Sequence, residues 1–170
     1  MHNRGPTPGF TLAELAPVAK LRVQAMPGTR ATALASAQLP QTPNTVHGAH
    51  PWTLWLGPRE WLVYGMAASV AELESRFAAD IAAGTLVCAD TSSGLTLLEL
   101  EGPRSVEMLS AGSGLDFEGG ALAAGACAQT QLFQIPLIIH RPDARLLWRL
   151  FVDRSLVRWV SAVLNDPGGG

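Results

Sequence analysis

The sequence predicts an α+β protein made of two similar units, each with helices packed on an antiparallel sheet. Three observations lead to this fold class: an aromatic β-hairpin, an amphipathic helix directly after it, and the element order β-α-β-β-α followed by β-β-α-β-β-β-α. We expect one domain over residues 14–165, with half-units at about 16–84 and 85–165. The Gly- and Pro-rich residues 1–13 predict a flexible N-terminal arm, and residues 166–170 predict a flexible tail.

The first half begins with a strand, a short helix and a hairpin. Residues 18–26 alternate apolar with polar side chains, which is typical of a half-buried strand. Residues 29–39 are rich in alanine and predict a short helix that Pro40 ends, and a loop with two prolines follows over 41–51. Residues 52–64 carry aromatic and branched side chains on both sides of a Gly-Pro-Arg-Glu turn, which predicts a β-hairpin.

The clearest helix is expected over residues 70–83. Ser69 and Glu72 have the spacing of a capping box, in which the hydroxyl and the carboxylate each accept a hydrogen bond from a free backbone N–H. Gly84 is expected to end the helix. Apolar residues recur at helical spacing and predict the buried stripe, which consists of Val70, Leu73, Phe77 and Ile81.

The second half contains two further helices and three strands. One helix is expected to start at Pro103, where a missing N–H costs no hydrogen bond, and to end near Gly112 with Val106 and Leu109 buried. The last helix is expected over 155–164, and its apolar face consists of Leu156, Val160, Val163 and Leu164. Three strand-like runs lie between these helices, at 129–134, 136–140 and 146–152.

Composition argues against nucleic acid and membrane surfaces as partners. The chain has 12 basic and 14 acidic residues, with no block of like charge. Only 15% of the residues are charged, against roughly 25% in typical soluble domains. Two interpretations remain open: the many alanines raise the apolar fraction, or part of the surface is covered by another chain.

The chain shows no sign of export or membrane insertion. Residues 1–8 lack the apolar core of a secretory signal, and no stretch approaches the ~18 apolar residues of a membrane span. Cys88 and Cys127 are too few and too far apart for a zinc motif or a disulfide framework. A cytoplasmic protein is therefore expected.

Two groups of residues contain side chains that are common in metal sites or catalytic triads, and neither group forms a complete motif. His47 and His50 offer two imidazoles, but zinc sites need three or four converging ligands, so we interpret both as loop residues and expect no metal. Ser92, His140 and Asp90 include the residue types of a catalytic triad, but the G-x-S-x-G turn that exposes a nucleophile is missing around the serine. We therefore expect no catalytic residue.

Four arginines lie close together in the last third of the chain, at Arg145, Arg149, Arg154 and Arg158. They fall across a predicted strand and a predicted helix. They either bind an anion or an acidic partner, or are simply solvated.

Four short blocks carry a resemblance to a known family over roughly residues 16–164. They are W-L-G-P-R-E-W-L from Trp55, D-T-S-S-G-L-T-L-L-E-L-E-G-P-R from Asp90, G-x-C-A-Q-T-x-L from Gly125, and Leu137–Arg141 with the strand after it. In this order and spacing they resemble the gamma subunit of heterotetrameric sarcosine oxidase. That subunit is related to the folate-binding module of the glycine-cleavage T protein, and the resemblance implies the fold of that module.

The resemblance also implies a function. The complex converts sarcosine, oxygen and water to glycine, formaldehyde and hydrogen peroxide, and passes the one-carbon unit to tetrahydrofolate. FAD, covalent FMN and NAD belong to the larger subunits, and the folate site to the alpha subunit. The resemblance thus implies a non-catalytic chain that binds no cofactor itself, is inactive alone, and packs in the complex with alpha, beta and delta subunits.

An alternative function is a free-standing folate- or one-carbon-binding protein of the same fold. That alternative requires an acid facing the pterin and an arginine facing the glutamate tail, and Asp90 with Arg104 is the pair that the sequence offers. For the subunit hypothesis, the hairpin is the predicted docking surface. Trp55, Arg59 and Trp61 are its candidate anchors, because Trp and Arg dominate interface hot spots.

Overall fold

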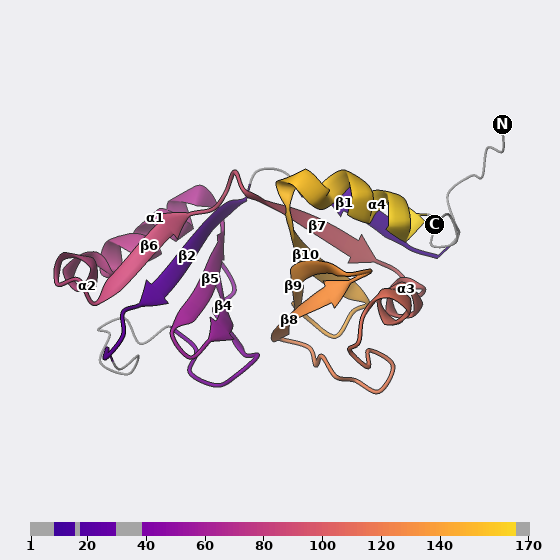
Figure 1. Ribbon diagram of the computed structural model, residues 1–170, viewed down its shortest axis with the longest axis horizontal. Helices are drawn as coiled ribbons and strands as arrows, with labels where there is room; N and C mark the ends of the chain where they lie inside the picture. Colours follow the sequence, from indigo (N-terminus) through magenta and orange to yellow (C-terminus); the bar gives the residue numbers. More distant parts are fainter. Residues whose placement is uncertain (1–8, 16–17, 30–38, 166–170) are drawn as a thin grey trace. The chain divides into compact units, whose positions relative to one another are not determined.

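The computed structural model describes residues 9–15, 18–29 and 39–165, which form two five-stranded antiparallel sheets with helices (Figure 1). The predicted α+β fold class is confirmed. The described residues separate into two compact units. The N-terminal unit comprises those between 16 and 95 together with Ala126–Ala128, and the C-terminal unit comprises the others.

The N-terminal unit is built on a sheet with strand order β3-β4-β5-β2-β6. Its elements are β2 (Ala19–Ala25), β3 (Val46–His47), β4 (Trp52–Gly57), β5 (Glu60–Gly65), α1 (Ala67–Arg76), α2 (Ala78–Ala82) and β6 (Leu86–Asp90). The predicted first strand and the predicted hairpin are both present, and the hairpin pairs Trp55 with Trp61. The predicted helix at 29–39 lies almost entirely outside the described residues.

The boundary between the half-units differs from the prediction. The half-units were expected at about 16–84 and 85–165, whereas the N-terminal unit continues to Leu95. The reason is β6, which pairs antiparallel with β2 along the edge of the N-terminal sheet, with Val23 opposite Cys88. This pairing joins residues that are far apart in the sequence. The local composition around residues 84 and 85 does not reveal it.

The core of the N-terminal unit lies between one face of its sheet and α1. Val23, Trp61 and Phe77 are completely buried in it. The predicted stripe is confirmed for Val70, Leu73 and Phe77, but Ile81 is 39% exposed. Phe77 is the C-cap of α1 and the N-cap of α2, which is a separate short helix without a buried residue.

The predicted capping box is wrong. Helix α1 starts at Ala67, directly after Met66, and no side chain caps its first turn. Ser69 therefore lies inside the helix, because β5 leads into the helix almost without a linker. The predicted stop is confirmed at Gly84, which has φ +69°.

The C-terminal unit is built on a sheet with strand order β1-β7-β10-β9-β8. Its elements are β1 (Thr11–Glu14), β7 (Leu95–Glu101), α3 (Ser105–Gly112), β8 (Ala126–Leu132), β9 (Ile135–Arg141), β10 (Leu147–Asp153), the 3₁₀ helix η2 (Arg154–Leu156) and α4 (Val157–Asn165). The first residue of β7 and the first three residues of β8 are counted with the N-terminal unit. Helix α3 begins two residues after Pro103, which lies in a turn. It buries Met108 and Leu109, while Val106 is half-buried. In α4, Val160 and Leu164 are buried as expected.

Strand β1 falls in the segment predicted as an unstructured arm. It pairs antiparallel with β7, with Leu12 opposite Leu100 and Glu14 opposite Leu98. Most of its side chains are exposed, so its four residues show no alternation that a sequence pattern could reveal. The rest of the predicted arm, residues 1–8, and the predicted tail lie outside the described residues.

The turn after β7 requires glycine at position 102. Gly102 has φ +132°, and a Cβ there would lie 2.5 Å from the Gly9 carbonyl oxygen and 2.7 Å from the Phe10 Cα. We expect Gly102→Ala to lower the free energy of unfolding by about 1–3 kcal/mol, because it combines backbone strain with a clash against main chain. Urea denaturation measures this. Gly114→Ala is the matched control, because nothing lies within 4 Å of its Cβ position. Equal effects at both glycines would contradict the prediction.

Candidate functional site

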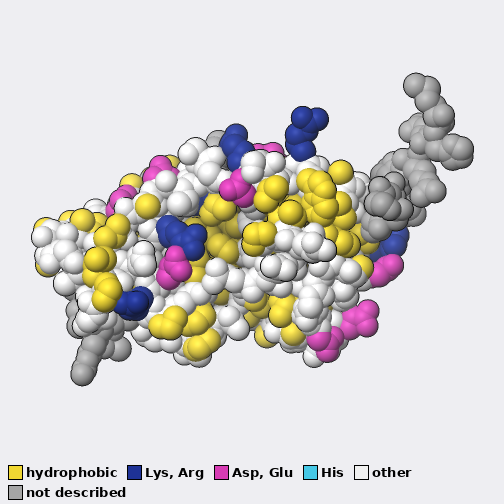
Figure 2. Space-filling model, viewed as in Figure 1, with side chains coloured by type: hydrophobic (Ala, Val, Ile, Leu, Met, Phe, Trp, Pro, Cys, Tyr) yellow, Lys and Arg dark blue, Asp and Glu magenta, His cyan; other side chains and the backbone are white. Residues whose placement is uncertain are grey.

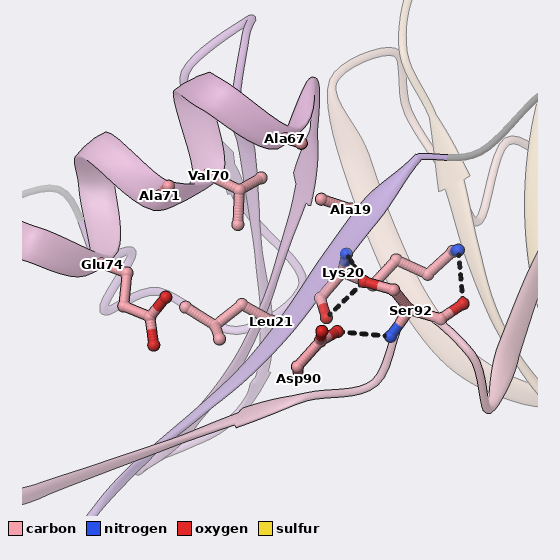
Figure 3. Close-up of a pocket in the computed structure, with 9 residues that line it drawn as sticks. All are labelled: Ala19, Lys20, Leu21, Ala67, Val70, Ala71, Glu74, Asp90 and Ser92. Atoms are coloured by element: carbon pink, nitrogen blue, oxygen red, sulfur yellow. Dashed lines mark hydrogen bonds between the residues drawn. The ribbon is translucent and has the colours of Figure 1, made fainter.

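The N-terminal unit contains a small open pocket between α1, β2 and the end of β6 (Figure 3). Its volume is about 200 Å³. Small-molecule sites usually measure about 300–1,000 Å³. The pocket is lined by Ala19, Lys20, Leu21, Ala67, Val70, Ala71, Glu74, Asp90 and Ser92.

The polar groups of the pocket hold the chain together after β6. Lys20 is only 5% exposed, and its Nζ donates to the carbonyl oxygens of Val18 at 2.9 Å and Ser92 at 3.4 Å. The backbone N–H of Lys20 donates to Ser92 Oγ at 2.9 Å. Figure 3 shows the lysine side chain extending from β2 on the side away from α1, with its ammonium group next to Ser92. These hydrogen bonds join β2 to the turn after β6, so the polar groups stabilise the fold at this point.

Asp90 belongs to the same network. Its carboxylate accepts a hydrogen bond from the backbone N–H of Ser92 at 2.8 Å, and hydrogen bonding by Ser92 lowers the pKa of this exposed carboxyl. The carboxylate is therefore ionised and cannot serve as a general acid at neutral pH. The third residue type of a triad, His140, is a fully buried residue of β9 in the C-terminal unit and does not line this pocket.

The pair proposed for folate is not assembled in this pocket. Asp90 lines it, but Arg104 does not. Arg104 is the N-cap residue of α3 in the C-terminal unit. Its Nε and Nη2 donate to the carboxylate of Glu107 at 2.9 and 3.0 Å, which raises the pKa of Arg104 and lowers that of Glu107. Within the described residues, Arg104 therefore has Glu107 as its carboxylate partner, and the pocket is smaller than most small-molecule sites.

The two histidines of the loop before the hairpin lie in different settings. His47 is an exposed residue of β3, and the rings of His50 and Trp52 form an edge-to-face pair with 6.0 Å between their centroids. Within residues 9–15, 18–29 and 39–165, no three His, Cys, Asp or Glu side chains converge as metal ligands would. In the same ranges no helix is long and apolar enough to cross a membrane.

Both thiols are unreactive at neutral pH. Burial raises the pKa of Cys88 to about 11, with a further contribution from Glu74, and burial also raises the pKa of Cys127 to about 11. The thiolate is the nucleophilic form, and at these pKa values it is nearly absent at pH 7.

The structure corrects one of the three docking anchors predicted on the hairpin. Trp61 is 0% exposed, and its indole N–H donates to the Pro40 carbonyl oxygen at 2.8 Å. It is a core residue and cannot contact a partner. Trp55 lies opposite Trp61 and is half-buried against the same core, so it presents only part of its ring. Arg59 is exposed in the turn.

Two of the four grouped arginines form ion pairs with carboxylates, and the paired Arg145 is itself exposed. Arg145 pairs with Asp143 at 2.9 Å, and Arg149 pairs with Glu99 at 3.3 Å. Arg154 and Arg158 are exposed. Next to them, the sequence interpretation missed Trp159, which is 45% exposed on α4. Its signal was available, since Trp159 does not belong to the predicted apolar face of that helix. Figure 2 shows hydrophobic side chains gathered over α4.

Comparison with known proteins identifies relatives over almost the whole chain, although no protein-family model matches. Two curated relatives are named sarcosine oxidase subunit gamma. The protein from Corynebacterium sp. (strain P-1) is 30% identical over 96% of this chain and 84% of its own length, and the one from Arthrobacter sp. is 29% identical with the same coverage.

Solved structures agree with these relatives. A chain of the heterotetrameric sarcosine oxidase from Corynebacterium sp. U-96, in complex with pyrrole 2-carboxylate, superposes with a TM-score of 0.79 and 25% identity, covering 92% of this chain and 82% of that one. The glycine cleavage system aminomethyltransferase T from Bartonella henselae gives a TM-score of 0.65 at 16% identity and shows the shared fold; 45% of its chain is covered. The chain belongs to the sarcosine oxidase gamma subunit family.

Proposed function

We propose that this chain is the non-catalytic assembly subunit of a heterotetrameric enzyme that oxidatively demethylates sarcosine. The observation that carries the proposal is the similarity to gamma subunits over 96% of the chain, together with the TM-score of 0.79 to a chain of the heterotetrameric enzyme. The polar groups of the pocket support it, because Lys20, Asp90 and Ser92 are engaged in holding β2 against the turn after β6.

The chemistry in this proposal belongs to the larger subunits. FAD, FMN and NAD are assigned to the alpha and beta subunits, tetrahydrofolate to the alpha subunit, and a small delta subunit completes the complex. The gamma chain supports their assembly. Two free cysteines with raised pKa values suit a reducing cytoplasm, where disulfides are rare.

The predicted docking role of the hairpin is retained for two residues. Arg59 is exposed at the turn, and Trp55 keeps part of its ring accessible. We place both residues at the rim of the interface, where truncating a side chain to alanine lowers the binding affinity only slightly.

Co-expression with the larger subunits of the same organism tests the proposal. With an affinity tag on this chain, we expect a yellow complex to be retained whose flavin absorbance is bleached by sarcosine without oxygen. The tagged chain expressed alone is expected to be colourless and inactive. The proposal is wrong if the larger subunits form active enzyme while the tagged chain elutes without them.

A further inference from the structure

Helix α4 presents an apolar strip that the described part of the chain leaves uncovered. Trp159 is 45% exposed, Ala162 is exposed and Val163 is half-buried. Residues three and four positions apart lie on the same side of a helix, so these three side chains form one continuous strip. Val160 and Leu164 lie on the adjacent side of α4, which is buried in the C-terminal unit, and the half-buried Val163 lies at the border between the two sides.

Two cations accompany the strip. Arg154 and Arg158 are exposed, lie four residues apart, and pair with none of the carboxylates in the described residues. The contrast with Arg145 and Arg149 is informative, because those two arginines have carboxylate partners within their own unit. The positive charge next to Trp159 is therefore available to a partner.

We propose that this α4 docking face, made of Trp159, Ala162 and Val163 with Arg154 and Arg158, binds a larger subunit of the complex at an apolar depression rimmed by carboxylates. The inference rests on the proposed function, which supplies the partner. Trp and Arg are the residues most enriched at interface hot spots, and an indole placed beside guanidinium groups fills an apolar depression while the cations meet acidic groups at its rim.

The size of the exposed ring distinguishes this face from the hairpin. Trp159 is 45% exposed, whereas Trp61 is 0% exposed and Trp55 is packed against the core. Truncating a buried tryptophan weakens the fold, but truncating Trp159 leaves the buried side of α4 in place. Loss of binding without loss of stability is therefore the signature expected of the α4 docking face.

The test measures binding of the full-length chain to the purified larger subunits by biolayer interferometry at several salt concentrations. Trp159→Ala is expected to weaken binding by at least about tenfold while thermal unfolding stays close to wild type. Arg158→Gln is expected to weaken binding less and to reduce its salt dependence, because a screened charge pair is lost. Met66→Ala is the matched control, since Met66 is 69% exposed but lies in the N-terminal unit.

The outcomes separate this inference from the proposed function. If wild type binds and both α4 variants bind with an affinity within twofold of it, the assignment of α4 is wrong while the proposed function stands. Equal losses of affinity in Met66→Ala and Trp159→Ala would have the same meaning. Wild type that binds none of the larger subunits would contradict the proposed function and the assignment with it. If the isolated chain sediments as a dimer that Trp159→Ala disperses, the face binds a second copy instead, and the inference is wrong.

Discussion

Replacing Trp61 with alanine is expected to lower the free energy of unfolding by about 3–5 kcal/mol. The side chain is 0% exposed and belongs to the core cluster with Phe77 and Val23. Its removal leaves a cavity the size of an indole between the sheet and α1. The substitution also removes the indole N–H of Trp61, which donates a hydrogen bond to the Pro40 carbonyl oxygen at 2.8 Å.

Urea denaturation followed by far-UV circular dichroism measures this effect without relying on the lost fluorophore. Trp159→Ala is the natural comparison, because a surface substitution usually changes stability by less than about 0.5 kcal/mol. Trp61→Phe is expected to fall between the two, since it keeps much of the apolar volume but not the indole N–H. If Trp61→Ala has the same free energy of unfolding as Trp159→Ala, the placement of Trp61 in the core is wrong.

The second large effect concerns pH and comes from His140. This residue is 0% exposed, and burial lowers its pKa to about 3, helped by the positive charge of Arg149 and opposed by Asp143. In the unfolded chain a histidine titrates near 6.5. Between pH 6.5 and 3 the unfolded state therefore binds a proton that the native state does not, so stability is lost as the pH falls through this window.

The expected loss is up to about 1.4 kcal/mol for each pH unit below 6.5. Asp143 and Asp153 have lowered pKa values because of hydrogen bonds from Arg145 and Ser155, and their contribution disappears only in more acidic solution. Asp90 and Glu107 also have lowered pKa values, but all four carboxyls are present in wild type and in a His140 variant, so the difference between the two proteins isolates the histidine. We expect wild type to lose about 2 kcal/mol more than His140→Gln between these two pH values. Parallel losses in the two proteins would show that His140 is not buried in its neutral form.

The fold class could be predicted from the sequence because its signals are local. Strand-forming residues on both sides of a Gly-Pro turn indicate the hairpin. Helical spacing of apolar residues indicates the buried stripe of Val70, Leu73 and Phe77. What the sequence did not reveal depends on distant partners. Strand β1 exists because Leu12 lies opposite Leu100, and no property of the segment itself indicates that pairing.

The candidate site was predictable in kind but not in position. Aromatic residues and arginines in the hairpin indicated a docking surface, yet alternation along one strand could not show that Trp55 and Trp61 face each other across the hairpin and share one core. The exposed tryptophan is on α4 instead, beside arginines that the sequence had already grouped. Which arginines form ion pairs depends on Asp143 and Glu99, and only the folded chain brings Glu99 to Arg149.

Native mass spectrometry of the co-expressed complex, purified through a tag on a larger subunit, tests the central claim most directly. We expect one dominant assembly that contains a single copy of this chain together with the larger subunits, and we expect a smaller share of the assemblies to retain the chain when Trp159→Ala is introduced. An active assembly of the larger subunits that contains none of this chain would contradict the account.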